Sequence, residues 1–326
     1  MPIKPVFVFG LPRSGSTLVQ KILAAHPAVA SAAEPWILLP LVYALRGQGI
    51  RTEYVQGTAA KAVGEFVDTL PRGRSDYYAA VHDLCLSLYR ASAGPEATHF
   101  VDKTPRYHLV VDEILEIFPE ARCILLWRNP LAIAASIINT WSRRGRWNLY
   151  RFNVDLYKGL ENLIRAAQAS PERLFPVRYE DMVERPQDLW PRIFAHLELD
   201  YDASVLDRYT DVRFSGSMGD PTGASRYSAI SAGSVDAWRE AFDTPLRRRW
   251  GRRYLRWLGR ERLEAMGYDL AKLEEALSGP PRIRPVRECS DALRMTLGTI
   301  YGSADLPAVR RVLRRGLSKE RAYAVT

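Results

Sequence analysis

Cysteine is scarce in this chain of 326 residues, which contains only Cys85, Cys123 and Cys289. The three residues lie far apart and lack the close spacing of metal-binding cysteines, so they predict no thiolate metal site. A sparse, odd-numbered set is typical of proteins in a reducing compartment, and we therefore expect a cytoplasmic location.

Long hydrophobic runs are also absent. No apolar run approaches the roughly 20 residues that a membrane-spanning helix needs. The first apolar run follows no basic leader, so we expect no cleaved secretion signal. Zinc-finger spacing and an aromatic–basic platform for single strands are missing as well, and we expect no nucleic-acid partner. A hydrophobic content of 47% and a charged content of 25% predict a globular protein with a substantial core.

Positive charge is unevenly placed along the chain. The net charge is +9, and residues 280–326 alone hold ten Lys or Arg and four Asp or Glu, a net charge of +6. We therefore divide the chain into one domain over 1–270 and a basic, helical extension over 271–326. The run RRVLRR at 310–315 is typical of a solvated helix, and contact with an anionic membrane or partner is the alternative.

A glycine-bearing loop stands almost at the start of the chain. Residues 6–18 read VFVFGLPRSGSTL, which predicts a buried strand, a tight loop and the first turn of a helix. Gly10 and Gly15 have the spacing of a phosphate-binding loop. Backbone N–H groups converge at such a turn, and the helix dipole adds partial positive charge, so we predict a socket for a phosphate group.

The loop differs from that of a nucleotide triphosphatase in its cation. Ser16 and Thr17 stand where such an enzyme has Lys followed by Ser or Thr, and the cation is instead Arg13, inside the loop. The lysine that reaches the β- and γ-phosphates and the hydroxyl that holds Mg²⁺ are thus both displaced. This pattern argues against ATP with magnesium, although a small-molecule kinase remains an alternative.

Strands and helices alternate along the sequence. The predicted strands are 6–9, 100–101, 123–127 and 174–179, and the predicted helices are 17–25, 35–45, 59–70, 77–91, 109–117 and 153–169, with another beginning at 130. Such alternation predicts an α/β fold with a doubly wound parallel sheet flanked by helices. Ligands bind at the carboxyl ends of the strands in these sheets. Arg13, Lys103, Arg128 and Glu180 each follow a predicted strand, so we expect them at one edge.

An arginine and the start of a helix follow the strand at 123–127. Arg128 offers a planar fork to a phosphate, and Asn129 and Pro130 have the residue types of a helix N-cap and first helical position.

With these motifs, the chain resembles the sulfotransferases that use 3′-phosphoadenosine 5′-phosphosulfate (PAPS). The matching segments are 10–17, 128–130 with Ser136, 178–182 (RYEDM) and, most loosely, 233–239 (GSVDAWR). The resemblance extends over about residues 5–270, and the motif layout is closest to the bacterial and protein-tyrosine sulfotransferase branch. It implies the P-loop-like sulfotransferase fold, PAPS as co-substrate and 3′-phosphoadenosine 5′-phosphate (PAP) as product.

The resemblance also implies roles for individual residues. The loop would hold the 5′-phosphosulfate, Arg128 and Ser136 the 3′-phosphate, and Tyr179 the adenine, while the late segment would close over the nucleotide. The implied cofactor-binding residues are Arg13, Ser14, Gly15, Ser16, Thr17, Arg128, Ser136, Tyr179, Arg226, Ser234 and Trp238.

The implied chemistry is in-line sulfuryl transfer, which depends on positioning and on charge stabilisation and needs no metal in principle. Arg13, Thr17 and Lys103 are the candidates that stabilise charge on the leaving oxygen. An acceptor hydroxyl also needs a general base at hydrogen-bonding distance. Glu34 is the first candidate for the base, because the protein-tyrosine sulfotransferases have a glutamate in this place, and His108 is the second.

The acceptor is the least constrained part of the prediction. We expect a hydroxyl of a glycan, a glycolipid or a small metabolite, with a peptide tyrosine as the alternative. Segments 46–74 and 141–153 are expected to form the walls of its pocket, and Trp141 and Trp147 suit stacking on a sugar. A non-catalytic nucleotide-binding protein is the alternative outside the enzymes. The oligomeric state is not predicted.

Overall fold

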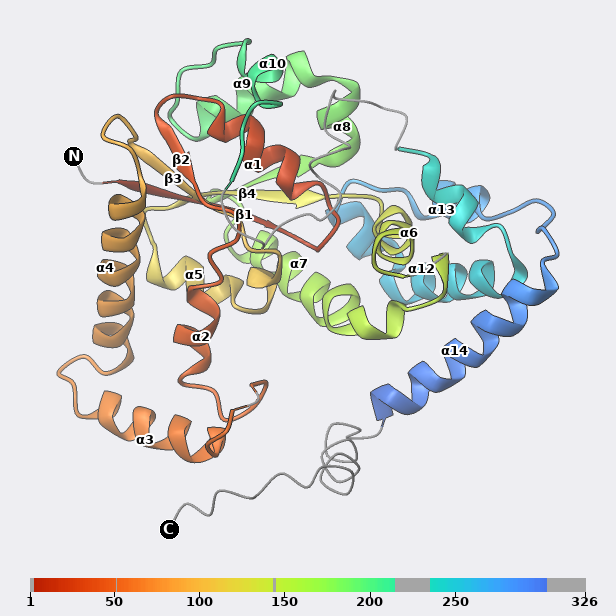
Figure 1. Ribbon diagram of the computed structural model, residues 1–326, viewed down its shortest axis with the longest axis horizontal. Helices are drawn as coiled ribbons and strands as arrows, with labels where there is room; N and C mark the ends of the chain where they lie inside the picture. Colours follow the sequence, from red (N-terminus) through yellow and green to blue (C-terminus); the bar gives the residue numbers. More distant parts are fainter. Residues whose placement is uncertain (1–2, 51, 143–144, 215–234, 304–326) are drawn as a thin grey trace.

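A parallel five-stranded sheet forms the centre of the molecule (Figure 1). The computed structural model describes residues 3–50, 52–142, 145–214 and 235–303. Neighbouring strands in the order β2-β3-β1-β4-β5 are all parallel, which confirms the predicted α/β class. The strands are β1 (Lys4–Gly10), β2 (Val29–Ser31), β3 (His99–Asp102), β4 (Arg122–Trp127) and β5 (Leu174–Arg178).

Helices cover both faces of the sheet (Figure 1). Those before β4 are α1 (Ser16–Ala24), α2 (Leu38–Tyr43), α3 (Gln56–Asp68), α4 (Arg74–Ser92), η1 (Pro105–Leu109) and α5 (Val111–Ile117). Those between β4 and β5 are α6 (Pro130–Trp141), η3 (Leu149–Phe152), the π-helical turn η4 (Val154–Gly159) and α7 (Leu160–Ala169). Those after β5 are α8 (Tyr179–Glu184), α9 (Pro186–His196), α10 (Val205–Arg208), η6 (Ala237–Phe242), α12 (Pro245–Ala265), α13 (Leu270–Ala276) and α14 (Pro285–Ser303).

The alternation of side chains along β1 divides the core into two layers. Successive residues of a strand point to opposite faces. Phe7 and Phe9 belong to the larger hydrophobic cluster, with residues of α4, α5, α6 and α12, whereas Val6 and Val8 belong to the smaller cluster, with residues of α1 and α9. The central strand is therefore buried on both sides, as its continuous apolar sequence predicts.

Most predicted elements are present, with shifted ends. The helix predicted at 35–45 begins only at Leu38, and the strand predicted at 174–179 ends at Arg178 because Tyr179 begins α8. β2 was not predicted, since three residues carry too little periodicity to signal a strand. The helix cap after β4 is confirmed: Asn129 Oδ1 accepts from the backbone N–H of Leu131 at 2.9 Å, with Pro130 at the first helical position.

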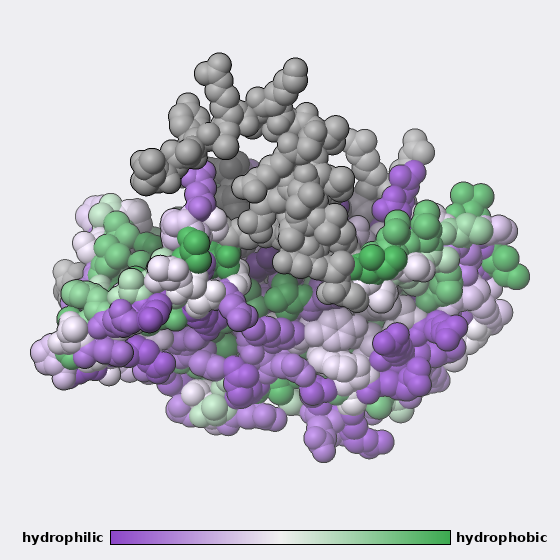
Figure 2. All heavy atoms as spheres, turned by 90° about the horizontal axis from the view of Figure 1, so that it is seen from below, coloured by the Kyte–Doolittle hydropathy of each residue, from purple (hydrophilic) through white to green (hydrophobic). Residues whose placement is uncertain are grey.

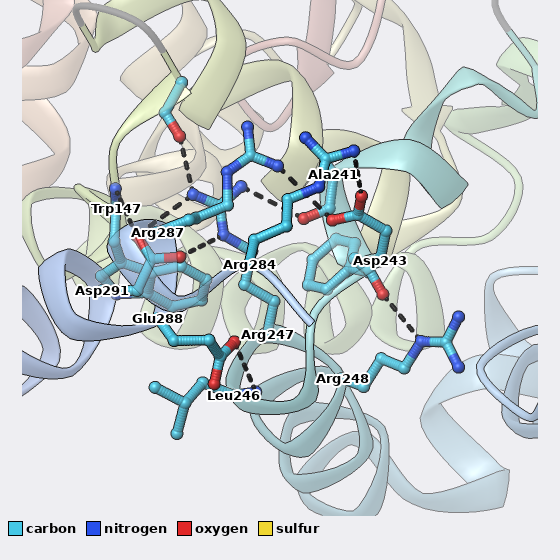
Figure 3. Close-up of polar contacts among 12 residues, drawn as sticks. Trp147, Ala241, Asp243, Leu246, Arg247, Arg248, Arg284, Arg287, Glu288 and Asp291 are labelled. Carbon is cyan, nitrogen blue, oxygen red and sulfur yellow. Dashed lines mark hydrogen bonds and ion pairs between the residues drawn. The ribbon is translucent and has the colours of Figure 1, made fainter. Parts of the chain in front are cut away.

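The C-terminal extension is helical in α13 and α14, and a buried ion pair anchors α14 on α12. Arg247 Nε donates to Asp291 Oδ2 at 2.6 Å, and both side chains are 1% exposed. Asp243 lies near this pair (Figure 3). Its carboxylate forms ion pairs with Arg284 at 2.9 Å and with Arg287 at 3.4 Å. These contacts hold the start of α14 against the α/β part of the chain.

The outward face of α14 is apolar. Its exposed large hydrophobic residues are Val286, Leu293, Leu297 and Ile300. Hydrophobic residues gather at this end of the molecule when it is seen from below (Figure 2). Within the described ranges, no helix is both long and apolar enough to cross a bilayer.

Candidate active site at the carboxyl edge of the sheet

The loop between β1 and α1 is built on two sterically constrained glycines. A Cβ at Gly10 would lie 2.8 Å from Ser14 Oγ, and a Cβ at Gly15, whose φ is 101°, would overlap the Tyr179 ring. Arg13 also has a positive φ, of 71°, which is uncommon for a residue with a side chain. Strain of this kind costs about 1–3 kcal/mol and is typical of functional loops.

Polar groups in this loop are arranged to receive an anion. α1 begins without a side-chain cap, so its first N–H groups point out of the helix end. Ser14 Oγ is buried and has no hydrogen-bond partner among the described residues. Buried hydroxyls normally have partners, and none of the described residues supplies one here, so this hydroxyl suits an anionic ligand.

The residues of the predicted second phosphate site lie together beside the loop. Arg128 Nη1 donates to the carbonyl oxygen of Arg13 at 3.0 Å, and Arg13 Nε donates to Ser136 Oγ at 3.2 Å. The Arg128 guanidinium stacks on the Tyr179 ring, 4.1 Å from its centroid. Its Nε is buried without a partner in the part of the chain that the structure describes. A planar fork with one donor unused fits a phosphate.

A buried ion pair joins Glu34 to Lys103. Lys103 Nζ donates to Glu34 Oε1 at 2.7 Å, and the side chains are 1% and 9% exposed. The second oxygen, Oε2, accepts from the indole Nε1 of Trp36 at 3.1 Å. Lys103 follows β3 and Glu34 follows β2, so the parallel sheet places both residues at its carboxyl edge.

One cavity brings several of these groups together. Its lining residues come from the loop, the segment after β2, the ends of β3 and β4, and the end of α6: Pro12, Arg13, Gly15, Ser16, Thr17, Glu34, Lys103, Pro105, Arg128 and Trp141. Cations, hydroxyl groups and one carboxylate thus face the same space. In the described residues, no three His, Cys, Asp or Glu side chains are grouped to hold a metal ion.

Asp102, the residue before Lys103 in the chain, is fully buried. Its carboxylate accepts from the hydroxyls of Tyr89 at 2.7 Å, Tyr107 at 2.9 Å and Thr104 at 3.2 Å. Burial raises the pKa of Asp102 to about 6, because its three hydroxyl donors and the nearby Lys103 only partly offset the loss of water. Burial and the neighbouring carboxylate together hold the pKa of both tyrosines well above the usual range.

His108 lies outside the cavity lining. Its ring is fully buried, Nε2 is 2.9 Å from Asp155 Oδ1, and the other edge packs on Gly159. Arg106 also pairs with Asp155, at 3.1 Å. A general base has to reach the proton of the acceptor, and this ring is enclosed by η1 and η4. The geometry therefore favours Glu34 over His108.

Tyr179 and Trp238, which were predicted to bind the nucleotide, do not line the cavity. The Tyr179 ring lies beneath Gly15 and against Arg128, so it supports the loop. Trp238 is buried in η6 and does not line the cavity; its ring centroid lies 6.2 Å from that of Phe242. Arg226 and Ser234 lie outside the described residues.

Of the two tryptophans expected to stack on an acceptor, only Trp141 lies at the cavity. Trp141 lines the cavity, is 38% exposed, stacks on Phe152 with ring centroids 4.9 Å apart, and carries the Arg13 guanidinium at 5.5 Å. Trp147 is instead buried. The bond from the Trp36 indole to Glu34 was not predicted from the sequence.

Comparison with known proteins connects this site to a family. Residues 5–203 match the model of the sulfotransferase family. The chain is 33% identical over 258 residues to nodulation protein NoeE of Sinorhizobium fredii, covering 72% of this chain and 59% of that protein. It is 25% identical over 211 residues to protein-tyrosine sulfotransferase 1 of Danio rerio, covering 63% and 56%. The chain thus spans less than two thirds of the length of either relative.

A solved structure supports the fold. The sulfotransferase domain of the Synechococcus PCC 7002 olefin synthase superposes with a TM-score of 0.50 at 24% identity, covering 73% of this chain and 88% of that domain. This likeness concerns the arrangement of the sheet and its helices.

Proposed function

Because this chain belongs to the sulfotransferase family, we propose that it moves the sulfuryl group of PAPS to an acceptor hydroxyl, with Glu34 as the general base. PAPS-dependent sulfuryl transfer is the general reaction of the family. The observation that carries the assignment of the base is the Glu34–Lys103 ion pair, which faces the same cavity as the phosphate loop.

The donor groups of the site suit a nucleotide with phosphates at two places. The loop and the start of α1 supply N–H groups and hydroxyls for the 5′-phosphosulfate. Arg128 and Ser136 supply a fork and a hydroxyl for the 3′-phosphate. Ser14 Oγ and Arg128 Nε have no partner among the described residues, so each of these two sites has one polar atom that a ligand would satisfy.

The reaction can be written with this chain's residues in defined roles. The acceptor oxygen attacks sulfur, the bond from sulfur to the bridging oxygen of the 5′-phosphate breaks, and the acceptor proton passes to Glu34. PAP leaves with the bonding electron pair on that oxygen, where Arg13, Lys103 and Thr17 stabilise the charge. Atoms and charge balance in these steps with the side chains named.

The Glu34–Lys103 ion pair offers a reason why the charge on the leaving oxygen is stabilised more strongly in the transition state than in the ground state. As Glu34 takes up the proton, its attraction for Lys103 weakens. The Lys103 ammonium then interacts more strongly with the charge that develops on the leaving oxygen. Catalysis requires this kind of differential interaction, which is stronger in the transition state than in the ground state.

For the acceptor, we propose a hydroxyl of a glycan, a glycolipid or a small metabolite. The half-exposed Trp141 ring at the cavity supports this choice, since sugar rings pack well on such a surface. A peptide tyrosine is the second candidate, supported by the similarity to protein-tyrosine sulfotransferases.

Two experiments test the proposal. Isothermal titration in EDTA is expected to show binding of PAP, whereas ATP binding that requires magnesium would indicate a kinase. Transfer of ³⁵S from labelled PAPS is then measured with a neutral oligosaccharide, a glycolipid, a tyrosine peptide and a simple phenol. Absence of PAP binding, or binding without transfer to any acceptor or to water, would contradict the proposed reaction.

A further inference from the structure

Both oxygens of the Glu34 carboxylate are held in place by side chains. Lys103 donates to one oxygen at 2.7 Å, and the Trp36 indole donates to the other at 3.1 Å. A carboxylate held at a single oxygen can still rotate about its terminal bond, whereas two donors from different directions fix its plane. The indole bond therefore determines which lone pairs face the cavity.

The indole reaches back to Glu34 because the backbone between them is constrained. Pro35 has a fixed φ and restricts Glu34 to extended conformations. Trp36 has φ 56°, in the left-handed region that aromatic residues rarely adopt. A residue remains in such a conformation only when its surroundings hold it there.

Thr104 is the group that holds the Trp36 backbone. The N–H of Trp36 donates to Thr104 Oγ1 at 3.2 Å, and that hydroxyl in turn donates to Asp102 Oδ1 at 3.2 Å. Asp102 is fixed by two buried tyrosine hydroxyls, and the hydroxyl of Tyr107 also accepts the backbone N–H of Leu38 at 3.4 Å. This buried network thus binds the segment that carries Glu34 through two backbone N–H groups, those of Trp36 and Leu38.

We propose that Trp36 is a positioning residue for the general base, and that Thr104, fixed by Asp102, holds Trp36 in its strained conformation. This inference rests on the proposed role of Glu34. The indole N–H of Trp36 orients the Glu34 carboxylate toward the acceptor. The hydroxyl of Thr104 acts indirectly, by accepting the backbone N–H of Trp36. Neither residue touches the reacting atoms.

The first test compares Trp36→Phe with the wild type. Phenylalanine keeps an aromatic ring and the same backbone requirement but lacks the N–H donor. We expect kcat to fall on the order of tenfold, because small misplacements of a catalytic group are costly. The Kd for PAP should stay within about twofold, since the phosphate sites are untouched. Trp257→Phe makes the same change on α12, outside the cavity lining, and should leave kcat unchanged.

The second test uses a matched pair at Thr104. Thr104→Val keeps the shape and removes the hydroxyl, whereas Thr104→Ser keeps the hydroxyl. We expect the valine variant to lose kcat on the order of tenfold at unchanged PAP affinity, and the serine variant to recover most of it. Equal losses in the two variants, wild-type kcat in Trp36→Phe, or a parallel loss of PAP affinity would overturn the inference.

The assay keeps the inference separate from the proposed function. Each variant is measured as ³⁵S-sulfate release from PAPS to water, which needs no identified acceptor, and as transfer to the best acceptor of the panel. If Glu34→Gln retains turnover, the assignment of the base fails, and the inference fails with it. If Glu34→Gln is inactive while Trp36→Phe and Thr104→Val match the wild type, the inference alone is wrong.

Discussion

Replacing Arg128 by alanine is expected to weaken binding of the 3′-phosphate far more than binding of the rest of the nucleotide. Arg128 follows β4, its guanidinium stacks on Tyr179, and its Nε is buried without a partner among the described residues. We assign this unused donor, together with a terminal nitrogen, to the 3′-phosphate. Adenosine 5′-phosphosulfate lacks that phosphate, so the two nucleotides separate the two effects of the substitution.

The expected magnitude follows from the bonds that are lost. Hydrogen bonds to charged groups contribute about 1.5–3 kcal/mol each, so the loss of a fork corresponds to a drop in PAP affinity on the order of 100-fold or more. The variant also loses the 3.0 Å bond from Arg128 Nη1 to the carbonyl of Arg13. This bond supports the 5′ loop, and its loss should weaken binding of adenosine 5′-phosphosulfate by about tenfold at most.

Isothermal titration of both nucleotides at one salt concentration measures these two losses. Arg122→Ala is the matched control, because Arg122 begins β4, the strand that Arg128 follows, carries the same charge and pairs with the exposed Glu198 outside the cavity. Arg128→Lys should fall between the wild type and the alanine variant, since lysine keeps the charge but not the fork. Equal losses for the two nucleotides in Arg128→Ala would refute the assignment of the 3′ site.

Three further substitutions test the supporting structure. Gly15→Ala should reduce PAP affinity on the order of tenfold or more in a titration, because it forces a side chain into a left-handed backbone conformation; Gly64→Ala, in open space on α3, should not. Asp102→Asn should remove one pH dependence of the free energy of unfolding, measured with urea. In the wild type, the pKa of Asp102 is raised to about 6 by folding, so its contribution to stability is fully present below pH 4. About 3 kcal/mol of the free energy of unfolding is then lost as the pH rises through 6. A wild-type stability that rises relative to the variant over this range would contradict the burial of a charged Asp102. Asp291→Ala should lower the free energy of unfolding by about 3–5 kcal/mol, because it leaves the Arg247 charge buried. The double variant that combines Arg247→Met with Asp291→Leu should recover much of this loss, and equal instability of the single and double variants would argue against this reasoning.

The fold could be predicted from local patterns because its central strands are long and apolar. The run at 123–127 and the Asn129–Pro130 pair identify a buried strand followed by a capped helix, and the structure has both. β2 was missed because three residues do not establish a period. Its place at the edge of the sheet depends on pairing with β3, about 70 residues later in the chain.

The site was predictable to the extent that topology alone places residues. The rule that parallel strands present their carboxyl ends at one edge is enough to bring Arg13, Lys103 and Arg128 to one cavity. The positive φ of Trp36 and the pairing of His108 with Asp155 were not predictable, because they depend on contacts between segments far apart in sequence. No local spacing encodes such contacts.

The most direct test of the central claim is turnover of Glu34→Gln in EDTA, measured as ³⁵S transfer from PAPS and compared with the wild type. The substitution keeps the size of the side chain and removes its ability to take up a proton. The account predicts a fall in kcat of about 100-fold or more, with the Kd for PAP within about twofold of the wild-type value. Near-normal turnover in this variant would contradict the assignment of Glu34 as the base.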